Sequence, residues 1–308
     1  MIVTVTLNPA WDLRVYYAHD GTVADQTGEA GGKGINVARV LTGLGTPCMA
    51  AAWLAGNTGR MVEARLKMDG ILVQAFPGQG ETRTNIKHIE LATGDTTEEN
   101  RPGQPMGHDP EAAFFDWLPT VVRTGDAVAL CGSLPAGVPP TIYADMIARL
   151  KAAGIRTVLD ASGDALKHGA MSAPALIKPN EAEFCEWLER EPEDHAAFQK
   201  AVREAADKTG SNLLVTRGEK SAFLCAEGVC YEAVSEPVRS VGTTGAGDAC
   251  LAAFLAAEAD GLSPPDCLRF AIGAAACFVS GCAISRESVA PFAERVQVNR
   301  LPQAVPDC

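Results

Sequence analysis

The feature that most constrains the fold is a regular alternation, from residue 110 onward, of short apolar segments with longer segments of helical periodicity. The apolar segments are Ala127–Cys131, Thr157–Leu159, Ala175–Ile177 and Leu213–Thr216, and the helical segments include Thr141–Ala153 and Ala196–Thr209. Strands that alternate with helices form a parallel sheet with helices on both faces. We therefore expect an α/β fold with a doubly wound, mostly parallel sheet.

The N-terminal third adds strands and an insertion of a different kind. Ile2–Leu7 and Cys48–Leu54 have the apolar character of buried strands. Residues 11–30 are polar and turn-rich, and Glu81–Leu91 alternates with a period of two before an acidic, proline-bearing run. We interpret the insertions at about 11–30 and 81–105 as a small β-sheet lid on a single domain spanning residues 1–308.

Charge and composition exclude several classes of partner. The net charge of −12 argues against a nucleic-acid or membrane surface as the main partner. The sequence has no 18-residue apolar run, and Met1 leads directly into a strand-like segment rather than a leader. The ten cysteines form no C-x-x-C pair, and several lie in apolar runs. We expect a reduced, cytoplasmic protein without structural disulfides and without a metal site built from histidine or cysteine.

A glycine-rich stretch, Ser240–Leu251, reads SVGTTGAGDACL and precedes an apolar run that continues to Ala259. It predicts a tight loop that opens a buried helix, where free backbone N–H groups and the helix dipole attract an anion. Asp248 in this position has the chemistry of a general base that takes a proton from a hydroxyl. The alternative is a carboxylate that caps the helix after a glycine turn.

A second glycine-rich helix start, Ala30–Asn36, reads AGGKGIN. It is not a P-loop, because Lys33 is followed by glycine, and it fails the spacing of a dinucleotide fingerprint. Lys33 at a helix N-terminus suits a phosphate or a phosphorylated substrate, the alternative being an exposed loop lysine. Asp12 follows the first strand, at the sheet edge where ligands of α/β proteins bind, or else is a turn residue.

Arginines near the predicted lid are a third candidate group. Arg83 and Arg101 lie in or next to the lid, where they can close on an anionic substrate and exclude water. The alternative is solvated charge on an exposed sheet. Glu98 and Glu99 in the same segment would repel a phosphosugar unless they point outward.

Together these segments resemble the ribokinase-like carbohydrate kinases of the phosphofructokinase-B type. Two signatures match, GGKGINVARVLTGLG (Gly31–Gly45) and TTGAGDACLAAFL (Thr243–Leu255). Between them lie CGSLPAGVP (Cys131–Pro139), KPNEAEF (Lys178–Phe184) and VTRGEKSAF (Val215–Phe223). Their order and spacing fit over nearly the whole chain, and they look most like the subgroup that phosphorylates sugar phosphates.

The resemblance implies a role for each matched position. Asp248 would be the base, with Gly245, Ala246 and Gly247 as the anion hole. Residues implied to bind the sugar phosphate are Asp12, Gly31, Gly32, Lys33, Asn36, Arg83 and Ser133. Residues implied to lie along ATP are Lys178, Asn180, Thr216, Arg217, Gly218, Lys220 and Thr243, with Gly245 and Gly247. Asn180 and Glu183 match an N-x-x-E pattern that positions Mg²⁺ through water. The lids of two subunits commonly pair into a homodimer.

The implied reaction is ATP-dependent phosphorylation of a ketohexose monophosphate, first of all fructose 1-phosphate to fructose 1,6-bisphosphate. Alternatives are a tagatose-6-phosphate or fructose-6-phosphate kinase, and a kinase of an unphosphorylated sugar or nucleoside. A non-catalytic sugar-phosphate sensor is the alternative from another class, although it would have no use for the base. A nicotinamide-dependent oxidoreductase is disfavoured because both glycine loops fail the dinucleotide spacing.

Overall fold

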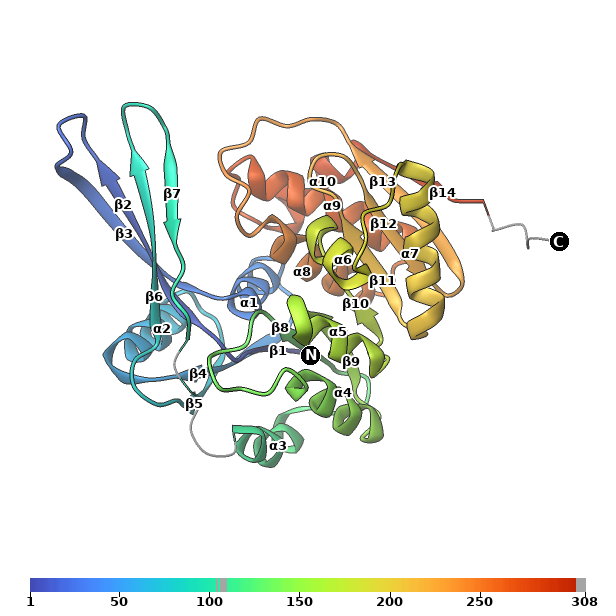
Figure 1. Cartoon of the computed structure of the whole chain (residues 1–308), viewed down its shortest axis with the longest axis horizontal. Helices are drawn as coiled ribbons and strands as arrows, with labels where there is room; N and C mark the ends of the chain where they lie inside the picture. Colours follow the sequence, from blue (N-terminus) through green and yellow to red (C-terminus); the bar gives the residue numbers. More distant parts are fainter. Residues whose placement is uncertain (104, 106–109, 303–308) are drawn as a thin grey trace.

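The computed structural model describes residues 1–103, 105 and 110–302. A large sheet forms its centre, and a smaller sheet projects from one end (Figure 1). Gln104, which falls in the predicted lid segment, lies outside the described residues. No helix among the described residues combines the length and the apolar character needed to cross a membrane.

The large sheet has ten strands in the described part of the chain, and seven of them are parallel. In spatial order the strands are β14 (Val296–Arg300), β13 (Val229–Ser235), β12 (Ala222–Ala226), β11 (Asn212–Thr216), β10 (Leu176–Ile177), β9 (Arg156–Asp160), β8 (Ala127–Cys131), β1 (Ile2–Thr6), β4 (Cys48–Leu54) and β5 (Val73–Pro77). The parallel part runs from β5 to β11, while β12, β13 and β14 are antiparallel. The predicted doubly wound, mostly parallel sheet is confirmed.

Helices cover both faces of this sheet, because its strands are apolar on both sides. One face is covered by α1 (Lys33–Gly43), α2 (Gly56–Met68), α8 (Ala246–Ala259), α9 (Pro264–Val279) and α10 (Arg286–Ala293). The other is covered by α3 (Pro110–Val121), α4 (Ile142–Ala152), α5 (Gly163–Met171), α6 (Glu181–Leu188) and α7 (His195–Thr209). In β8, Ala127 and Ala129 face the first set, and Val128 and Leu130 face the second. Small side chains on the first face let α8, buried from Asp248 to Ala257, lie close to the sheet.

The smaller sheet has the order β3-β2-β6-β7. Its strands are β2 (Ala10–Tyr17), β3 (Val23–Gly31), β6 (Arg83–Glu90) and β7 (Thr96–Glu99). The pair β2/β6 is parallel and the outer pairs are antiparallel. Both predicted insertions therefore contribute to one lid, which we call the β-lid. The acidic residues that were expected to repel a phosphosugar are paired, Glu98 with Lys87 (3.1 Å) and Glu99 with Arg101 (3.0 Å).

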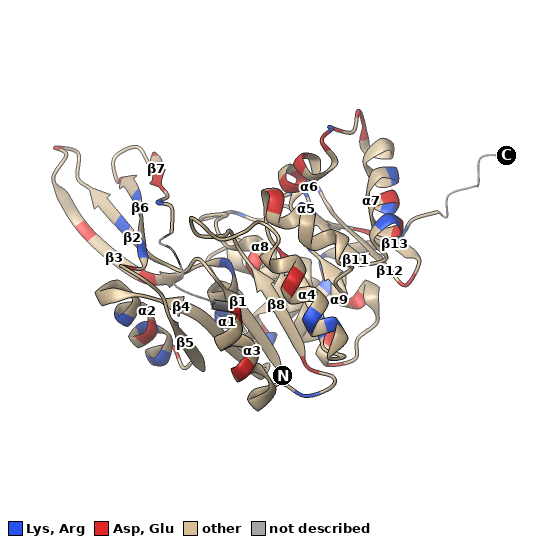
Figure 2. Ribbon diagram, turned by 60° about the horizontal axis from the view of Figure 1, so that its bottom comes forward, with Lys and Arg blue, Asp and Glu red and all other residues tan. Residues whose placement is uncertain are grey.

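Both α2 and α7 carry acidic and basic residues together (Figure 2). They form surface ion pairs such as Lys67–Glu63 (2.5 Å) and Lys200–Glu204 (3.9 Å). The acidic excess of the chain is therefore not concentrated on these two helices.

One prediction about the cysteines is wrong. Cys225 and Cys230 form a disulfide between β12 and β13. The two residues are directly opposite in the antiparallel register, with their Cα atoms 4.0 Å apart, so the hairpin itself brings the sulfurs together. β14 pairs with β13 and adds a third strand to this hairpin.

The first turn of α1 lies directly against β1, and only glycine fits there. A Cβ at Gly34 would lie 2.4 Å from Thr6 Oγ1 and 2.8 Å from the Val5 carbonyl oxygen. Neither neighbour is the flexible end of a long side chain. The glycine therefore sets how closely the AGGKGIN segment approaches the sheet.

We expect Gly34→Ala to lower the free energy of unfolding by about 1–3 kcal/mol, the usual cost of overpacking. The loss should appear although alanine is the better helix former. Urea unfolding of the variant measures it. Gly242→Ala is the control, because among the described residues, its chain neighbours aside, no atom lies within 4 Å of the Cβ position there. Equal stability of the two variants would contradict the close-packing argument.

Candidate active site

The site lies where α8 begins beside the carboxyl ends of the central strands. Gly245 caps α8 with a φ of 95°, a left-handed conformation that favours glycine. Asp248 lies in the first turn and is 7% exposed. The predicted loop and buried helix are confirmed, and the helix ends at Ala259 as expected.

The Asp248 carboxyl is held and oriented from α1. Asn36 Nδ2 donates to Asp248 Oδ2 at 2.8 Å. Arg39, which has donors only, donates to Asn36 Oδ1 at 3.0 Å and to the Ala30 carbonyl oxygen at 2.6 Å. Because Arg39 takes the amide oxygen, the amide N–H₂ group must face Asp248. Arg39 was not among the predicted site residues.

Burial dominates the titration of Asp248. Desolvation and the negative charge of Asp160 raise its pKa, while the hydrogen bond from Asn36 and the charges of Lys33 and Lys178 lower it. The result is a pKa of about 6. A carboxyl with this pKa is ionised at neutral pH and is a stronger base than an ordinary aspartate, as a general base requires.

Asp160, at the end of β9, is the centre of a buried charge cluster. It is fully buried and contacts two ammonium groups, Lys33 Nζ at 2.8 Å and Lys178 Nζ at 3.2 Å. Lys33 Nζ also donates to Glu183 Oε1 at 2.9 Å. Burial works to raise the pKa of Asp160, but the two lysines outweigh it and the pKa lies below its usual value. Burial likewise works to lower the pKa of Lys33, and Asp160 and Glu183 reverse this.

The position of Lys178 links this cluster to the glycine loop. Its Nζ lies 3.6 Å from the position a Cβ would take at Gly247, so the ammonium group is against the loop. The Ala246 N–H donates to the Thr243 carbonyl oxygen (3.1 Å), so this predicted anion-hole donor already has a partner. Positive charge near the loop therefore comes from the helix N-terminus and Lys178 together.

The predicted sugar-binding residues form a second group at the base of the β-lid. Asp12 Oδ1 accepts from Asn85 Nδ2 at 2.8 Å, across the paired strands β2 and β6. Gly31 lies at the end of β3, and a Cβ there would lie 1.9 Å from Asp12 Oδ2. Burial raises the pKa of Asp12, although the Asn85 hydrogen bond acts against it. Asn85 was not predicted, because only the strand register shows that it faces Asp12.

Arg83 and Lys33 do not share partners. Arg83 donates to the carbonyl oxygens of Asn8 (3.0 Å) and Arg101 (2.9 Å), and its buried Nε has no hydrogen-bond partner among the described residues. Ser133 Oγ accepts from Asn8 Nδ2 at 3.2 Å, next to this group. Gly32 is the N-cap of α1 with a φ of 117°. The ammonium of Lys33, by contrast, is already bound by two carboxylates, which we did not expect for a residue that meets a phosphate.

Asn180 and Glu183 form a capping box at the start of α6. Asn180 Oδ1 accepts from the Glu183 N–H (2.9 Å), and Glu183 Oε2 accepts from the Asn180 N–H (2.9 Å). The described residues hold no group of three or more His, Cys, Asp or Glu side chains placed for a metal ion. Glu183 Oε1 also accepts from Lys33 Nζ at 2.9 Å, so both carboxylate oxygens already have donors, which fits a cation held through water.

Comparisons with known proteins show what the whole chain is similar to. The model of the pfkB family carbohydrate kinases matches residues 6–288. The 1-phosphofructokinase of Xanthomonas campestris is 32% identical over 97% of this chain and 98% of its own length. That of Bacillus subtilis is 30% identical over 98% of this chain and 100% of its own. Phosphofructokinase-2 from Escherichia coli, solved in complex with fructose-6-phosphate, superposes with a TM-score of 0.88 at 26% identity, covering 95% of this chain and 98% of that one.

Replacing Asp160 and Asp248, the two buried aspartates of the site, by asparagine should change the stability of the fold in opposite directions. The pKa of Asp160 is lowered in the folded chain, so its charge stabilises the fold above about pH 4. Asp160→Asn leaves Lys178 without its carboxylate partner and Lys33 with Glu183 alone, and should cost about 3–5 kcal/mol at pH 8. The pKa of Asp248 is raised to about 6, so its ionised form costs stability once the pH exceeds that value. Asp248→Asn should therefore raise the melting temperature at pH 8.

Thermal and urea unfolding at pH 8 measure both effects. Asp260→Asn, which removes one partner of an exposed pair with Arg286, is the control and should change stability by at most about 1 kcal/mol. Destabilisation of the same size in all three variants would contradict the assignment of opposite pKa shifts.

Proposed function

Because the chain belongs to the pfkB family of carbohydrate kinases, we propose that it transfers the γ-phosphoryl group of ATP to fructose 1-phosphate and forms fructose 1,6-bisphosphate. The observation that carries the proposal is a buried carboxyl of raised pKa, Asp248, in the first turn of a glycine-capped helix beside Lys178. Relatives named 1-phosphofructokinase, at about one-third identity over nearly the whole chain, support the choice of substrate.

Asp248 is the base in this proposal. It takes the proton of the attacking sugar hydroxyl, whose oxygen forms a bond to the γ-phosphorus while the bond from that phosphorus to the β–γ bridging oxygen breaks, and ADP leaves. Asn36 and Arg39 keep the carboxyl in one orientation. The backbone N–H groups of Gly245 and Gly247, with Ala246 between them, bind the charge on the moving phosphoryl group.

The sugar phosphate binds between the β-lid and α1. Asp12, Gly31, Gly32 and Asn36 hold its hydroxyl groups in this proposal, since they lie where β2 and β3 join the main sheet. Arg83, with Ser133 nearby, meets the phosphate that the sugar already carries, and its unpartnered Nε supplies a donor. Lys33 is held by Asp160 and Glu183, so we place it between the sugar and nucleotide sides.

ATP binds across the ends of β10 and β11. The proposed contacts are Lys178, Asn180, Thr216, Gly218, Lys220 and Thr243. Arg217 lies beside them, but its guanidinium is already bound to Glu181. Glu183 and Asn180 hold Mg²⁺ through water, and the cation, when bound, neutralises phosphate charge. Lys178 is 2% exposed and fixed by Asp160, so it stabilises charge without moving.

The β-lid is the proposed surface of a homodimer. Every residue of β7 and the first five residues of β3 are exposed in the single chain, and Val23 on β3 is 56% exposed. Pairing with a second copy would cover these edge strands. We also place the protein in the cytoplasm, where its sugar phosphate and ATP are found.

A panel of acceptors tests the substrate. With Mg-ATP, we expect ADP release with fructose 1-phosphate at a kcat/KM at least tenfold above that with fructose 6-phosphate, tagatose 6-phosphate, fructose, ribose or adenosine. Preference for another ketose phosphate would change the assigned substrate and leave the proposed mechanism unchanged. Preference for an unphosphorylated acceptor would overturn the role of Arg83, and ATP binding without any turnover would favour a sugar-phosphate sensor.

The pH profile tests the base. Since Asp248 must be ionised to accept a proton and its pKa is about 6, log kcat/KM should be level at pH 7–8 and fall with unit slope below pH 6. Asp248→Asn should lower kcat by at least about 10³-fold and leave ATP binding, measured by calorimetry, within about twofold. Turnover near the wild-type rate in this variant would eliminate Asp248 as the base.

A further inference from the structure

The loop between β11 and β12 is tied to the start of α6. Arg217 N–H donates to the Ser221 carbonyl oxygen (2.9 Å), and Lys220 N–H donates to the Arg217 carbonyl oxygen (3.1 Å), so the loop is a tight turn. Just before it, Thr216 N–H donates to the Pro179 carbonyl oxygen (3.2 Å). We call residues 217–221 the β11–β12 turn. It has two cationic side chains in a chain of net charge −12.

Arg217, although cationic, is not free to meet a ligand. Its guanidinium stacks over the Phe198 ring at 4.1 Å and its side chain is only 12% exposed. Nε and one terminal nitrogen donate to Glu181 Oε1, at 3.0 and 2.7 Å. The other terminal nitrogen lies 3.3 Å from His195 Nδ1. Each of its three nitrogens therefore has a partner, and the residue acts as a brace between the turn, α6 and α7.

Glu181 holds the second cation of the turn as well. Lys220 Nζ lies 3.1 Å from Glu181 Oε2 and 3.4 Å from Oε1, while its side chain stays 64% exposed. Burial acts to raise the pKa of Glu181, but hydrogen bonds from Arg217 and Lys220 lower it below its usual value. One carboxylate therefore bridges both cations, and only Lys220 remains accessible from solvent.

The place of Glu181 on α6 connects this bridge to the buried charge cluster. Glu181 is the first residue of α6, and Glu183, two residues later, accepts from Lys33. The first turn of α6 therefore fixes two carboxylates: that of Glu183, which pairs with Lys33, and that of Glu181, which holds the β11–β12 turn. Its rigidity comes from the Asn180–Glu183 capping box.

We propose that Glu181 is a positioning residue for the nucleotide: it fixes the β11–β12 turn through Arg217, and it holds Lys220 ready to pair with ATP. Arg217 itself does not contact the nucleotide. This inference rests on the proposed phosphoryl transfer from ATP. It assigns to Glu181 a role in nucleotide affinity that is separate from the chemistry at Asp248 and from binding of the sugar phosphate.

The test is Glu181→Gln in the full-length protein, with Mg-ATP and fructose 1-phosphate varied in turn. The amide keeps the size of the side chain and loses the charge that holds two cations. We expect KM for ATP to rise about tenfold, with kcat within about twofold and KM for the sugar phosphate unchanged. Calorimetry with ATP alone should show the same loss of affinity, and this readout does not depend on turnover.

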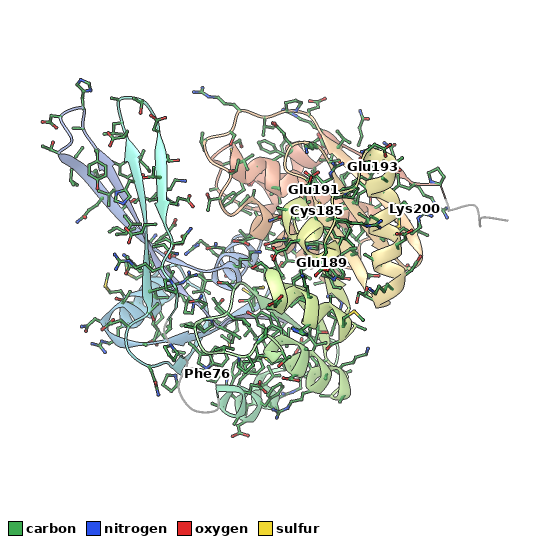
Figure 3. All side chains as sticks on the ribbon, in the orientation of Figure 1. Phe76, Cys185, Glu189, Glu191, Glu193 and Lys200 are labelled. Carbon is green, nitrogen blue, oxygen red and sulfur yellow. A yellow bond between two sulfur atoms is a disulfide. The ribbon has the colours of Figure 1, made fainter. Side chains whose placement is uncertain are left out.

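Glu189→Gln is the matched control. Glu189 ends the same helix α6 (Figure 3) and forms an exposed pair with Lys167 at 2.8 Å. The variant makes the same acid-to-amide change far along the helix from the turn, and it should leave both KM values and kcat as in the wild type. Arg217→Gln should raise KM for ATP as Glu181→Gln does. The double variant should be no worse than either single one, because both break the same brace.

The outcomes separate this inference from the proposed function. A wild-type protein that neither binds ATP nor turns over would overturn both. Wild-type turnover with an unchanged KM for ATP in Glu181→Gln would overturn the positioning role alone. Equal losses in kcat and both KM values, with a lowered melting temperature, would also overturn it, because they would make Glu181 a residue of general stability. If Glu181→Gln fails to fold, Arg217→Lys decides: we expect a smaller rise in KM for ATP, and an unchanged KM overturns the inference.

Discussion

The arrangement of the site depends on one buried charge, the carboxylate of Asp160 between Lys33 and Lys178. An isolated carboxylate with no exposure would be very costly to bury, and so would each ammonium group. Together with Glu183, which pairs with Lys33, they neutralise one another and fix three separate elements, α1, β9 and the segment after β10, at one edge of the sheet. Burial raises the pKa of Asp248 and the negative charge of Asp160 raises it further, so the same ion cluster that organises the site also sets the basicity of Asp248.

Close backbone contacts make this cluster possible. Gly34 lets α1 lie against β1, Gly31 leaves space for the Asp12 carboxylate, and Gly245 turns the chain into α8. Each glycine is required because a Cβ would clash with a neighbouring atom or because φ is left-handed. Each brings a charged side chain to the same edge of the sheet. The two glycine-rich stretches are therefore geometric requirements of the site as well as sequence signatures.

Much of this follows from the sequence because local signals agree with the global fold. The bounds of β4, of β8 and of α8 could be predicted, since apolar runs and a glycine N-cap define them locally. Asp160, Arg39 and Asn85 could not be assigned, because their partners come from elements distant in the chain or from strand register. The Cys225–Cys230 disulfide was missed for the same reason, as only the hairpin register places the two sulfurs opposite each other. The sequence did not predict β14, because these residues can be recognised as a strand only from their pairing with β13.

The β-lid affects how the sugar substrate of such a protein can change. Asp12 and Asn85 belong to the β-lid, whereas Asp248, Lys178 and Glu181 belong to the main domain. In the proposed function, part of the sugar recognition therefore lies on the β-lid and the phosphoryl transfer lies on the main sheet, and the two meet at Gly31 and Gly32. Substitutions in the lid strands can then change which sugar is bound, while the residues proposed for phosphoryl transfer stay unchanged. On this assignment, a change of sugar substrate needs new side chains in two short insertions and no rebuilding of the ten-stranded sheet.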